Sequence, residues 1–305
     1  MQRSIVTSAS ISAFTAKYEE HLLEVRGLSR ATCALHRQVV HKLLRYRFPN
    51  DQISWKEFHF SDCVGFLTQE FARLPNRDTQ RVWLMVMRSV VRYLGAQGCI
   101  SKGWDAALPK ITSYRHASLP RTLSAKQLQQ LWEASEGKDR RHLRYRALLL
   151  LCLRLGMRVG EVANLHLEDI DWKDGYLRVR GTKSHRDRTL PLPEDVGEAL
   201  VAHLRAGRPR SSRVFEPLRP PFTAERVRNH VVNSLHYLFS LARITSQGTH
   251  ALRHTAATAM VNEGASFKAV ADVLGHKRVS TTLIYAKLDL KALAQAALPW
   301  PGGAQ

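Results

Sequence analysis

The residues of this chain that could do chemistry concentrate in its last third. His250 and Arg253 lie three positions apart, His276 follows Gly275, and Tyr285 comes nine residues after His276. These residue types supply phosphate-binding cations, proton-transfer groups and a potential nucleophile. Phosphoryl transfer needs all three, because cations must surround the non-bridging oxygens while a nucleophile stands in line and an acid serves the leaving oxygen.

An arginine about ninety residues upstream of His250 completes the set. Arg158 follows Gly156, where a strongly apolar helix is predicted to end, so its side chain would project from a firm base. The rigid guanidinium fork can bind two phosphate oxygens at once. Glu161, one helical turn further on, could hold that guanidinium in a salt bridge or be an ordinary surface carboxylate. Taken alone, Arg158 would be read as a surface arginine.

Lys183 lies in a polar turn, Gly181–Arg188, between two predicted strands. A loop lysine can swing toward a phosphate and donate a proton if nearby charge lowers its pKa. His185, Arg186 and Arg188 compete for this role, and each is expected to be a DNA contact or a surface group. Turn lysines are usually solvated, so this signal is weak without the rest of the set.

Each histidine has an ordinary alternative. A spacing of three puts His250 and Arg253 on one helical face, which suits proton transfer beside a held phosphate. His254 points about 100° away from Arg253 around the helix and is taken as structural or surface. Gly275 lets the chain turn at a helix end and present His276, whose alternative is a buried, hydrogen-bonded histidine.

Tyr285 is the candidate nucleophile. A phenol with a pKa of about 10 is a poor nucleophile unless its anion is stabilised. Arg158, Arg253 and Lys183 are the cations expected to stabilise it. Most tyrosines are half-buried packing residues, so the spacing from His276 is what singles this one out.

Helices and one hairpin must position these residues. Apolar residues at helical spacing predict an all-helical segment from Ser10 to about Gly98. Alternation in Tyr176–Arg180 and Arg188–Leu192 predicts two antiparallel strands. The fold class is therefore mainly α with a small β-sheet (α+β). Further helices are predicted near Arg141–Leu155, Glu194–Leu204, Ala224–Leu241, Ala251–Glu263, Lys268–Leu274 and Thr281–Leu288.

Prolines and weak periodicity mark residues 109–120 as an interdomain linker. The predicted domains are then a helical domain, 1–108, and a second domain, 121–298, followed by a loose tail, 299–305. Leu290, Leu293, Ala294 and Ala297 form an apolar stripe near the end, which could bind a neighbouring copy or fold back onto its own domain.

The charge of the chain points to a polyanionic partner. The 305 residues carry a formal net charge of +20, and the pI is about 10.3. Such a surplus favours nucleic acid, since each neutralised phosphate releases counterions. The alternatives are a merely basic soluble protein or a membrane-surface binder. Arg77, Arg81 and Arg88, near the last N-terminal helix, could face DNA or form a solvated surface.

The cysteines and the apolar runs indicate the cellular compartment in which the protein is expected. Four scattered cysteines without metal-site spacing indicate free thiols in a reducing cytoplasm, and they argue against disulfides or a zinc site. The longest strongly apolar run, Ala147–Leu153, is too short to cross a bilayer. The sequence therefore predicts a soluble intracellular protein.

The order Arg–Lys–His-x-x-Arg–His–Tyr and the motifs around these residues resemble the tyrosine site-specific recombinase (phage-type integrase) family, in an Xer-like two-domain form. The motifs are Gly-Met-Arg158-Val-Gly-Glu161, Thr-His250-Ala-Leu-Arg253-His, Val-Leu-Gly-His276 and Ser-Thr-Thr-Leu-Ile-Tyr285. The likeness is strong over about Leu119 to Leu288. It extends weakly to the N-terminal half through Arg26-Gly-Leu-Ser29, similar to the family's helical core-binding (SAM-like) domain.

The resemblance implies a role for each residue of the set. Arg158 and Arg253 would hold the scissile phosphate, and Lys183 would protonate the departing 5′-oxygen. His250 would take part in acid–base transfer and His276 would hydrogen-bond the phosphate. Tyr285 would attack to form a 3′-phosphotyrosyl link. Because that link conserves the phosphodiester energy, the resemblance implies neither a metal nor a nucleotide cofactor.

The resemblance also implies partners. The helical domain and the catalytic domain would clamp double-stranded DNA, and a homo-oligomer, typically a tetramer on two DNA sites, would carry out recombination. Accessory proteins or sister recombinases could take part. The expected setting is the bacterial cytoplasm, with the protein on the nucleoid when active, and a mobile element is one expected source. The family's hairpin turn is usually richer in glycine and lysine, which makes Lys183 the weakest assignment.

Three rival functions remain open at this point. A type IB topoisomerase shares the tyrosine chemistry on a related fold, but the small helical domain and the integrase-like wording favour recombination. A DNA-binding protein that keeps the fold without cutting is disfavoured, because all six expected side chains are present. A hydrolytic nuclease would need a carboxylate cluster for metal, which the sequence does not offer.

Overall fold

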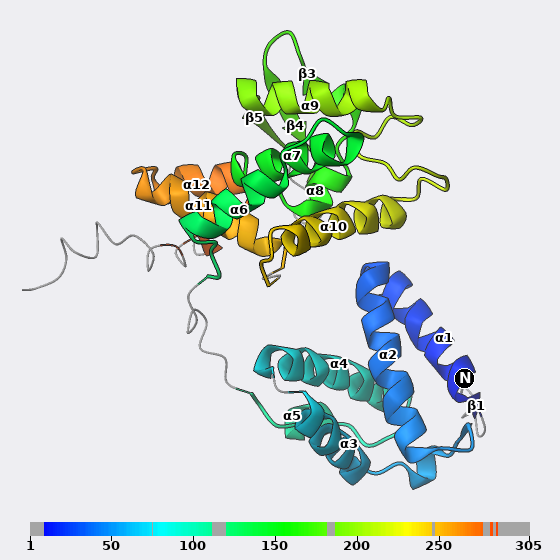
Figure 1. Ribbon diagram of the computed structural model, residues 1–305. Coiled ribbons are helices and arrows are strands. Elements are labelled where there is room, and N and C mark those ends of the chain that lie inside the picture. The colour runs from blue at the N-terminus through cyan, green and yellow to red at the C-terminus, as the bar shows by residue number, and fades with distance from the viewer. Residues whose placement is uncertain are drawn as a thin grey trace, which may run out of the picture. The chain divides into compact units, whose positions relative to one another are not determined.

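The computed structural model describes residues 9–74, 76–111, 120–181, 187–245 and 248–276, together with 281, 282 and 285. The chain divides into two compact units, residues 1–115 and 116–305 (Figure 1). Both are built mainly from helices; a two-stranded sheet lies in the first unit and a three-stranded sheet in the second. The predicted fold class, mainly α with a small β-sheet, is confirmed. The predicted linker falls largely on residues 112–119, which lie outside the described residues.

The N-terminal unit is a set of helices with one short pair of strands. Strands β1 (Ala9–Ser10) and β2 (Gln52–Ile53) pair antiparallel. The helices are α1 (Ile11–Glu24), α2 (Arg30–Arg47), the 3₁₀ helix η1 (Trp55–Glu57), α3 (Phe60–Arg73), α4 (Arg77–Ala96) and α5 (Trp104–Ala107).

Local sequence explains where these helices begin and how they pack. The side chains of Ser10 and Ser29 accept hydrogen bonds from backbone N–H groups of the first turns of α1 and α2. Apolar residues at helical spacing then form one core. Inside it, the Tyr18 hydroxyl contacts His36 and Ser89, 3.0 Å from each, so a polar network ties α1, α2 and α4 together.

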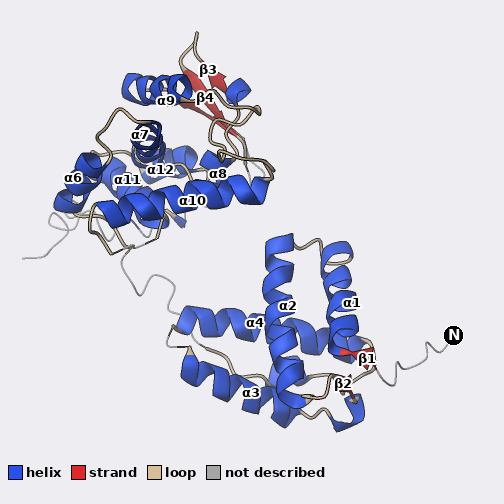
Figure 2. Ribbon diagram, turned by 45° about the vertical axis from the view of Figure 1, so that its right-hand side comes forward, coloured by secondary structure: helices blue, strands red, loops and turns tan. Residues whose placement is uncertain are grey.

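The C-terminal unit contains the remaining helices and strands of the described chain (Figure 2). Its helices are α6 (Ala125–Ala134), α7 (Arg140–Leu153), α8 (Val159–Ala163), the 3₁₀ helix η2 (Leu167–Asp169), α9 (Glu194–Ala206), α10 (Ala224–Leu241), α11 (His250–Asn262) and α12 (Phe267–Leu274). Helix α7 is the centre of the unit and packs against α8, α9, α10 and α11. Its residues Ala147–Cys152 are all buried, as the longest apolar run of the chain requires.

The sheet has three antiparallel strands in the order β3-β4-β5. They are β3 (Ile170–Asp171), β4 (Tyr176–Val179) and β5 (Arg188–Pro191). The predicted hairpin of β4 and β5 is confirmed, with Val179 opposite Arg188. Strand β3 was not predicted, because two residues are too few to show alternation. The turn at residues 182–186 lies outside the described residues.

Several predicted features lie at the C-terminal end of the chain. Most of the predicted helix Thr281–Leu288, the apolar stripe that follows it and the tail 299–305 lie outside the described residues. All four cysteines are free thiols. Within the described part of the chain, no helix is both long and apolar enough to cross a membrane.

Candidate active site

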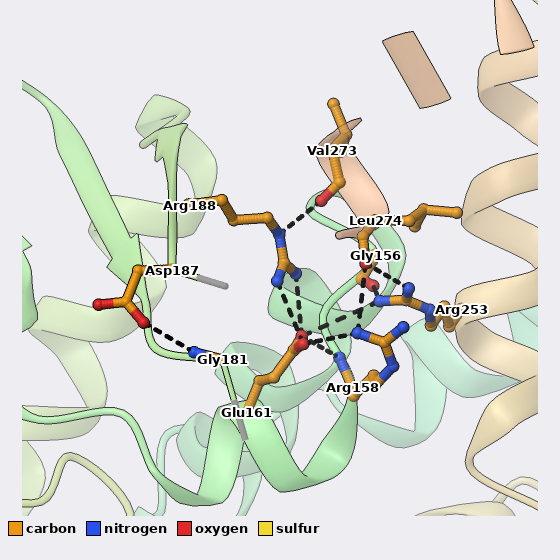
Figure 3. Close-up of polar contacts among 9 residues, drawn as sticks. All are labelled: Gly156, Arg158, Glu161, Gly181, Asp187, Arg188, Arg253, Val273 and Leu274. Carbon is orange, nitrogen blue, oxygen red and sulfur yellow. Dashed lines mark hydrogen bonds and ion pairs between the residues drawn. The ribbon is translucent and has the colours of Figure 1, made fainter. Parts of the chain in front are cut away.

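One buried carboxylate, Glu161 on α8, gathers three arginines from separate segments (Figure 3). Arg158 donates from Nη1 to Oε1 over 2.8 Å and from its backbone N–H to Oε2 over 2.9 Å. Arg188 donates from Nη1 to Oε1 over 3.1 Å and from Nη2 to Oε2 over 2.9 Å. Arg253 Nη1 lies 3.9 Å from Oε2. We call these four residues the arginine cluster.

The electrostatics of the arginine cluster favour an anion. Burial would raise the pKa of the Glu161 carboxyl, but the hydrogen bonds and charge of Arg188 and the hydrogen bonds of Arg158 outweigh it and keep the pKa below its ordinary value. Glu161 is therefore ionised at neutral pH. Three positive charges less one negative charge leave two in excess among the ion pairs of the described residues. A phosphate diester is an anion of the right sign to occupy this surplus.

Arg253 is the most enclosed of the three arginines. Its side chain is 5% exposed, and its Nη1 and Nη2 donate to the carbonyl oxygens of Gly156 and Leu274 over 2.6 and 2.5 Å. Burial, followed by the charge of Arg158, lowers the pKa of Arg253 to about 10. The group still carries its charge at pH 7. Arg253 thus holds the start of α8 and the end of α12 together while remaining cationic.

Arg158 is the most open of the three, with 23% of its side chain exposed. Its Nη1 also lies 3.3 Å from the carbonyl oxygen of Leu274. It is the N-cap residue of α8, and Glu161 at the third helical position accepts its backbone N–H. The guanidinium is therefore anchored at one nitrogen and open at others, which suits a group that must reach a ligand.

Two glycines make this close approach feasible. Gly156 has a φ of +59°, and a Cβ there would lie 2.6 Å from Leu274 Cδ2. Gly275 has a φ of +62° and ends α12 in the left-handed region, as the sequence predicted. A Cβ on Gly275 would lie 2.9 Å from Arg188 Nη1. Side chains at either position would push apart the segments that carry Arg158, Arg188 and His276.

Arg188 corrects an expectation. It was expected to be a DNA contact or a surface group, yet its side chain is only 10% exposed. Besides its two bonds to Glu161, it donates from Nε to the carbonyl oxygen of Val273 over 2.6 Å. Strand alternation could have revealed this, because Arg188 lies on the same face of β5 as buried Leu190. Arg188 is a buried link between the hairpin, α8 and α12.

His276 follows the glycine that ends α12. Its Nδ1 lies 2.8 Å from the hydroxyl of Thr282, which is fully buried. Burial, and then the charges of Arg253 and Arg158, lower the pKa of His276 to about 4. The imidazole is therefore neutral at pH 7. When Thr282 donates to Nδ1, the ring proton resides on Nε2, which leaves Nε2–H as a donor for an incoming oxygen.

Tyr285 reaches α11 from the far end of the described chain. It is 1% exposed and packs in an apolar cluster with Ala257, Val261, Val270 and Leu274. Burial raises the pKa of its phenol, while the charges of Arg253 and Arg158 act in the opposite direction. Burial outweighs the two arginines, so the pKa of the phenol stays above its ordinary value and the hydroxyl is protonated at neutral pH.

His254 was underestimated from the sequence. The sequence alone predicts a structural or surface role for His254, but this residue is half-buried and its Nδ1 lies 2.8 Å from the Tyr285 hydroxyl. The missed signal was the spacing of four from His250, which puts both histidines on one side of α11. Their ring centroids are 6.5 Å apart. His250 and His254 therefore lie on the same side of α11, and His254 is the one that contacts Tyr285.

The remaining candidates are placed as follows. His250 is exposed at the first position of α11. Lys183 and Arg186 lie outside the described residues. In the N-terminal unit, Arg81 pairs with Asp78 over 3.1 Å. Arg88 on α4 donates to the carbonyl oxygens of Leu108 and Pro109 over 3.2 and 2.6 Å, so it ties the segment that follows α5 to α4. Arg77 is exposed where α4 begins.

Comparison with known proteins adds a family. The family model described as "Phage integrase family" matches residues 121–291, which include every candidate residue of the C-terminal unit. A putative integrase/recombinase, y4rA of Sinorhizobium fredii, is 36% identical over 97% of this chain and 73% of its own length. The tyrosine recombinase XerD of Vibrio vulnificus is 28% identical over 94% of this chain and 96% of its own.

The fold is similar to that of solved structures. One is a lambda integrase tetramer bound to a Holliday junction, which has a TM-score of 0.68 at 19% identity. The likeness covers 91% of this chain and 78% of that one. At this identity it supports the architecture alone, and the chemistry has to be argued from the residues of this chain.

Proposed function

Because the chain belongs to the phage integrase family, we propose that it is a site-specific DNA recombinase with Tyr285 as its nucleophile. The observation that carries this proposal is the convergence on one place of Arg158, Arg253, His276 and Tyr285, which come from four separate segments. They combine surplus positive charge, a neutral hydrogen-bond donor and a hydroxyl. Those are the parts that phosphoryl transfer to a side chain requires.

The arginine cluster would bind the scissile phosphate. Its surplus of two positive charges would match the charge that develops on the non-bridging oxygens during attack. Arg158 would meet the phosphate with its open nitrogens, and Arg253 would contribute charge from behind. His276 would donate from Nε2 to a phosphate oxygen. Glu161 and Arg188 would hold Arg158 and Arg253, the two phosphate-binding arginines, in place.

The chemical step then exchanges one phosphoester for another. The Tyr285 oxygen attacks phosphorus, the bond to the 5′-oxygen breaks, and the product is a 3′-phosphotyrosyl link and a free 5′-hydroxyl. The leaving oxygen needs one proton, for which Lys183 is the proposed donor, with His250 assisting proton transfer. Rejoining reverses each step, so no energy source is consumed and no metal or nucleotide cofactor is needed.

A covalent adduct tests the assignment directly. Duplexes bound by the protein are first selected from a random-sequence pool, which supplies a site without knowledge of the host. The selected duplex is then nicked next to the cleavage position, so that the short 5′-hydroxyl product diffuses away and the adduct accumulates. The wild-type chain should form a denaturant-resistant protein–DNA band.

Two tyrosine variants complete the experiment. Tyr285→Phe should form no band, while Tyr237→Phe, which changes an exposed tyrosine on α10, should behave as wild type. An equally strong band with Tyr285→Phe would show that another group attacks. If the wild-type chain binds the selected duplex and yields no adduct, the rival of a DNA-binding protein without cleavage is correct.

The second candidate function, relaxation of supercoils as in type IB topoisomerases, predicts a different requirement. Relaxation of a plasmid without the selected site, at a rate similar to that of a plasmid with it, would favour this rival. Recombination between two selected sites on one plasmid, read as deletion or inversion of the intervening DNA, would favour the proposal. The family membership makes recombination the expected outcome.

We also propose that the N-terminal unit binds the same duplex. The net charge of +20 supports this, and among the sequence candidates Arg77 and Arg81 suit the role better than Arg88, whose guanidinium binds two carbonyls of its own unit. Arg81→Ala should weaken binding and lower the dependence of log K on log salt by about 1. An unchanged salt slope would remove Arg81 from the interface.

The active assembly is proposed to be a homotetramer on two sites, formed on double-stranded DNA in the bacterial cytoplasm. Accessory proteins, sister recombinases and carriage on a mobile element belong to the same proposal. Sedimentation of the protein with one or two selected sites would test the stoichiometry, and a complex of two chains on two sites would contradict it.

A further inference from the structure

A second group of basic side chains lies in the C-terminal unit, and none of its members belongs to the arginine cluster. Arg140 and Arg144 come from α7, His203 from α9 and His230 from α10, and α7 packs against both of the other helices. The charges of the two arginines act on both histidines, and His230 acts on His203, so the four side chains lie near one another. We call these four residues the basic cluster.

Every member of the basic cluster has a buried nitrogen without a hydrogen-bond partner. Within the described part of the chain, five buried side-chain nitrogen or oxygen atoms are unpaired, and four of them belong here: Arg140 Nε, Arg144 Nε, His203 Nδ1 and His230 Nε2. Buried polar groups in folded proteins are almost always paired. Their concentration at one place therefore points to a site that a polar ligand completes.

His203 is the most enclosed member of the basic cluster. It is 4% exposed, and its ring stacks on that of Phe215 with the centroids 4.9 Å apart. Its Nε2 lies 3.3 Å from the carbonyl oxygen of Val214. Because a carbonyl oxygen can only accept, the proton of the neutral ring resides on Nε2, and the unpaired Nδ1 carries a lone pair. The imidazole is thus held in place with an acceptor unused.

Arg140 and Arg144 form no ion pair with a carboxylate of the described residues. The carboxylate of Asp139, next to Arg140 in the sequence, is bound by His142 instead. Arg140 lies against the end of α9, where its Nη2 donates to the carbonyl oxygen of Gly207 over 3.4 Å. One long hydrogen bond and the negative end of the α9 dipole offset only part of two full positive charges.

The charge of the basic cluster comes from its arginines. Burial, and then the charges of the two arginines, lower the pKa of both histidines to about 4, so both imidazoles are neutral at pH 7. Burial also lowers the pKa of the Arg144 guanidinium, on which Tyr145, Arg140 and Arg141 act as well. The cluster is thus partly desolvated and positively charged, and a bound anion would offset the repulsion between its arginines.

We propose that the basic cluster binds a phosphate group that carries a proton, as inorganic phosphate or a phosphate monoester does. Arg140 and Arg144 take the unprotonated oxygens, because a guanidinium fork matches two phosphate oxygens. His203 accepts the phosphate hydroxyl at Nδ1, where the neutral ring has its lone pair. A phosphodiester has no such hydroxyl, which separates this ligand from the backbone of DNA. Both arginines are half-buried, so the ion can enter from solvent.

The test titrates the full chain with inorganic phosphate at pH 6 and constant ionic strength. The imidazole signals of His203 and His230 are followed by NMR and are assigned by their loss in His203→Gln and His230→Gln. In the wild-type chain both signals should move and give one Kd. Arg144→Gln removes a charged donor and should weaken phosphate binding about tenfold or more. Arg140→Gln is measured in parallel, so that misfolding of one variant does not decide the result.

Two control variants locate the bound phosphate. Arg146→Gln changes an exposed arginine of the same helix, which lies over the ring of Trp132, and it should bind phosphate as the wild-type chain does. Arg158→Gln removes the most open member of the arginine cluster. It should leave the response of His203 and His230 unchanged, because phosphate held near Glu161 is not what moves these signals.

The outcomes do not depend on whether Tyr285 forms an adduct. Signals that stay unmoved up to about 10 mM phosphate, tenfold above a weak Kd of about 1 mM, would overturn the proposal. Equal phosphate binding by Arg144→Gln, Arg140→Gln and wild type would overturn it as well. If the selected duplex moves both signals and inorganic phosphate moves neither, the basic cluster contacts phosphodiesters, and the assignment of a protonated phosphate is wrong.

Discussion

Around Glu161, three arginines are fixed by ion pairs and by carbonyl oxygens of the backbone, whereas Tyr285 is fixed by apolar packing and by a hydrogen bond to His254. The arginine side is charged, buried and connected to α8, α12 and the hairpin. The tyrosine side depends on contacts with α11 and α12. The difference indicates that the arginine half of the candidate site contributes to folding, while the tyrosine half can be altered with little effect on folding.

The largest effect is expected from removing the shared carboxylate. Glu161→Gln leaves three arginines close together without an anion, and breaking a buried ion pair in this way costs about 3–5 kcal/mol of unfolding free energy. Urea unfolding followed by tryptophan fluorescence measures the loss. Glu198→Gln, an exposed glutamate on α9, should stay within about 0.5 kcal/mol of wild type. A similarly small loss for Glu161→Gln would break the comparison.

The next largest effect tests whether Arg188 belongs to the half of the site that contributes to folding. Arg188→Met removes two hydrogen bonds to the buried Glu161 carboxylate and one to the carbonyl oxygen of Val273, which should cost about 2–3 kcal/mol of unfolding free energy. Arg178 is on the neighbouring strand and pairs with Asp187, but 62% of its side chain is exposed. Arg178→Met should cost about 0–1 kcal/mol. Equal costs would mean that burial does not distinguish the two arginines.

A pH dependence is expected where the two halves meet. The pKa of His276 is about 4 in the folded protein and about 6.5 when unfolded, so between these values the unfolded chain binds the additional proton. Stability should therefore be lost as the pH falls from about 6.5 to 4. The full shift corresponds to about 3 kcal/mol, and because solvent screens the partly buried ring the loss from this residue should be about 2 kcal/mol. Unfolding of wild type and His276→Gln across this range measures the difference. A difference that does not vary with pH would contradict the assignment.

The smallest effect on folding should come from Tyr285, the proposed nucleophile. Tyr285→Phe keeps the ring in its apolar cluster and removes one hydrogen bond, so the unfolding free energy should fall by about 1 kcal/mol or less. DNA cleavage should nevertheless be lost. A large destabilisation, measured in the same urea titration, would show that Tyr285 helps to build the unit and would remove the contrast between the two halves.

The sequence predicted the elements better than the partnerships between them. Periodicity located α7 and α10 and alternation located the hairpin, because a buried face repeats along one segment. Strand β3 was missed because two residues carry no period. The start of α6 also follows from local sequence, because Ser124 is a residue type that caps helices and its hydroxyl accepts the backbone N–H of Gln127.

In the candidate site, too, the sequence predicted the residues better than the contacts between them. The residue types and their order pointed to Arg158, Arg253, His276 and Tyr285, since chemistry constrains type. The roles of Arg188 and His254 depend on contacts between residues 27 and 31 positions apart in the chain. Local patterns contained hints of both, in the alternation of β5 and the spacing of four on α11. The partner in each case was visible only once the segments had folded together.

The bonds that Arg253 makes to the carbonyl oxygens of Gly156 and Leu274 have a genetic consequence. Every residue type offers the same carbonyl, so no substitution at either position can supply a replacement partner for an altered Arg253. A side chain added at Gly156 would also collide with Leu274. Suppressors of a defect at position 253 should therefore be absent from positions 156 and 274 in a genetic screen, and covariation among homologues should connect position 253 to neither of them.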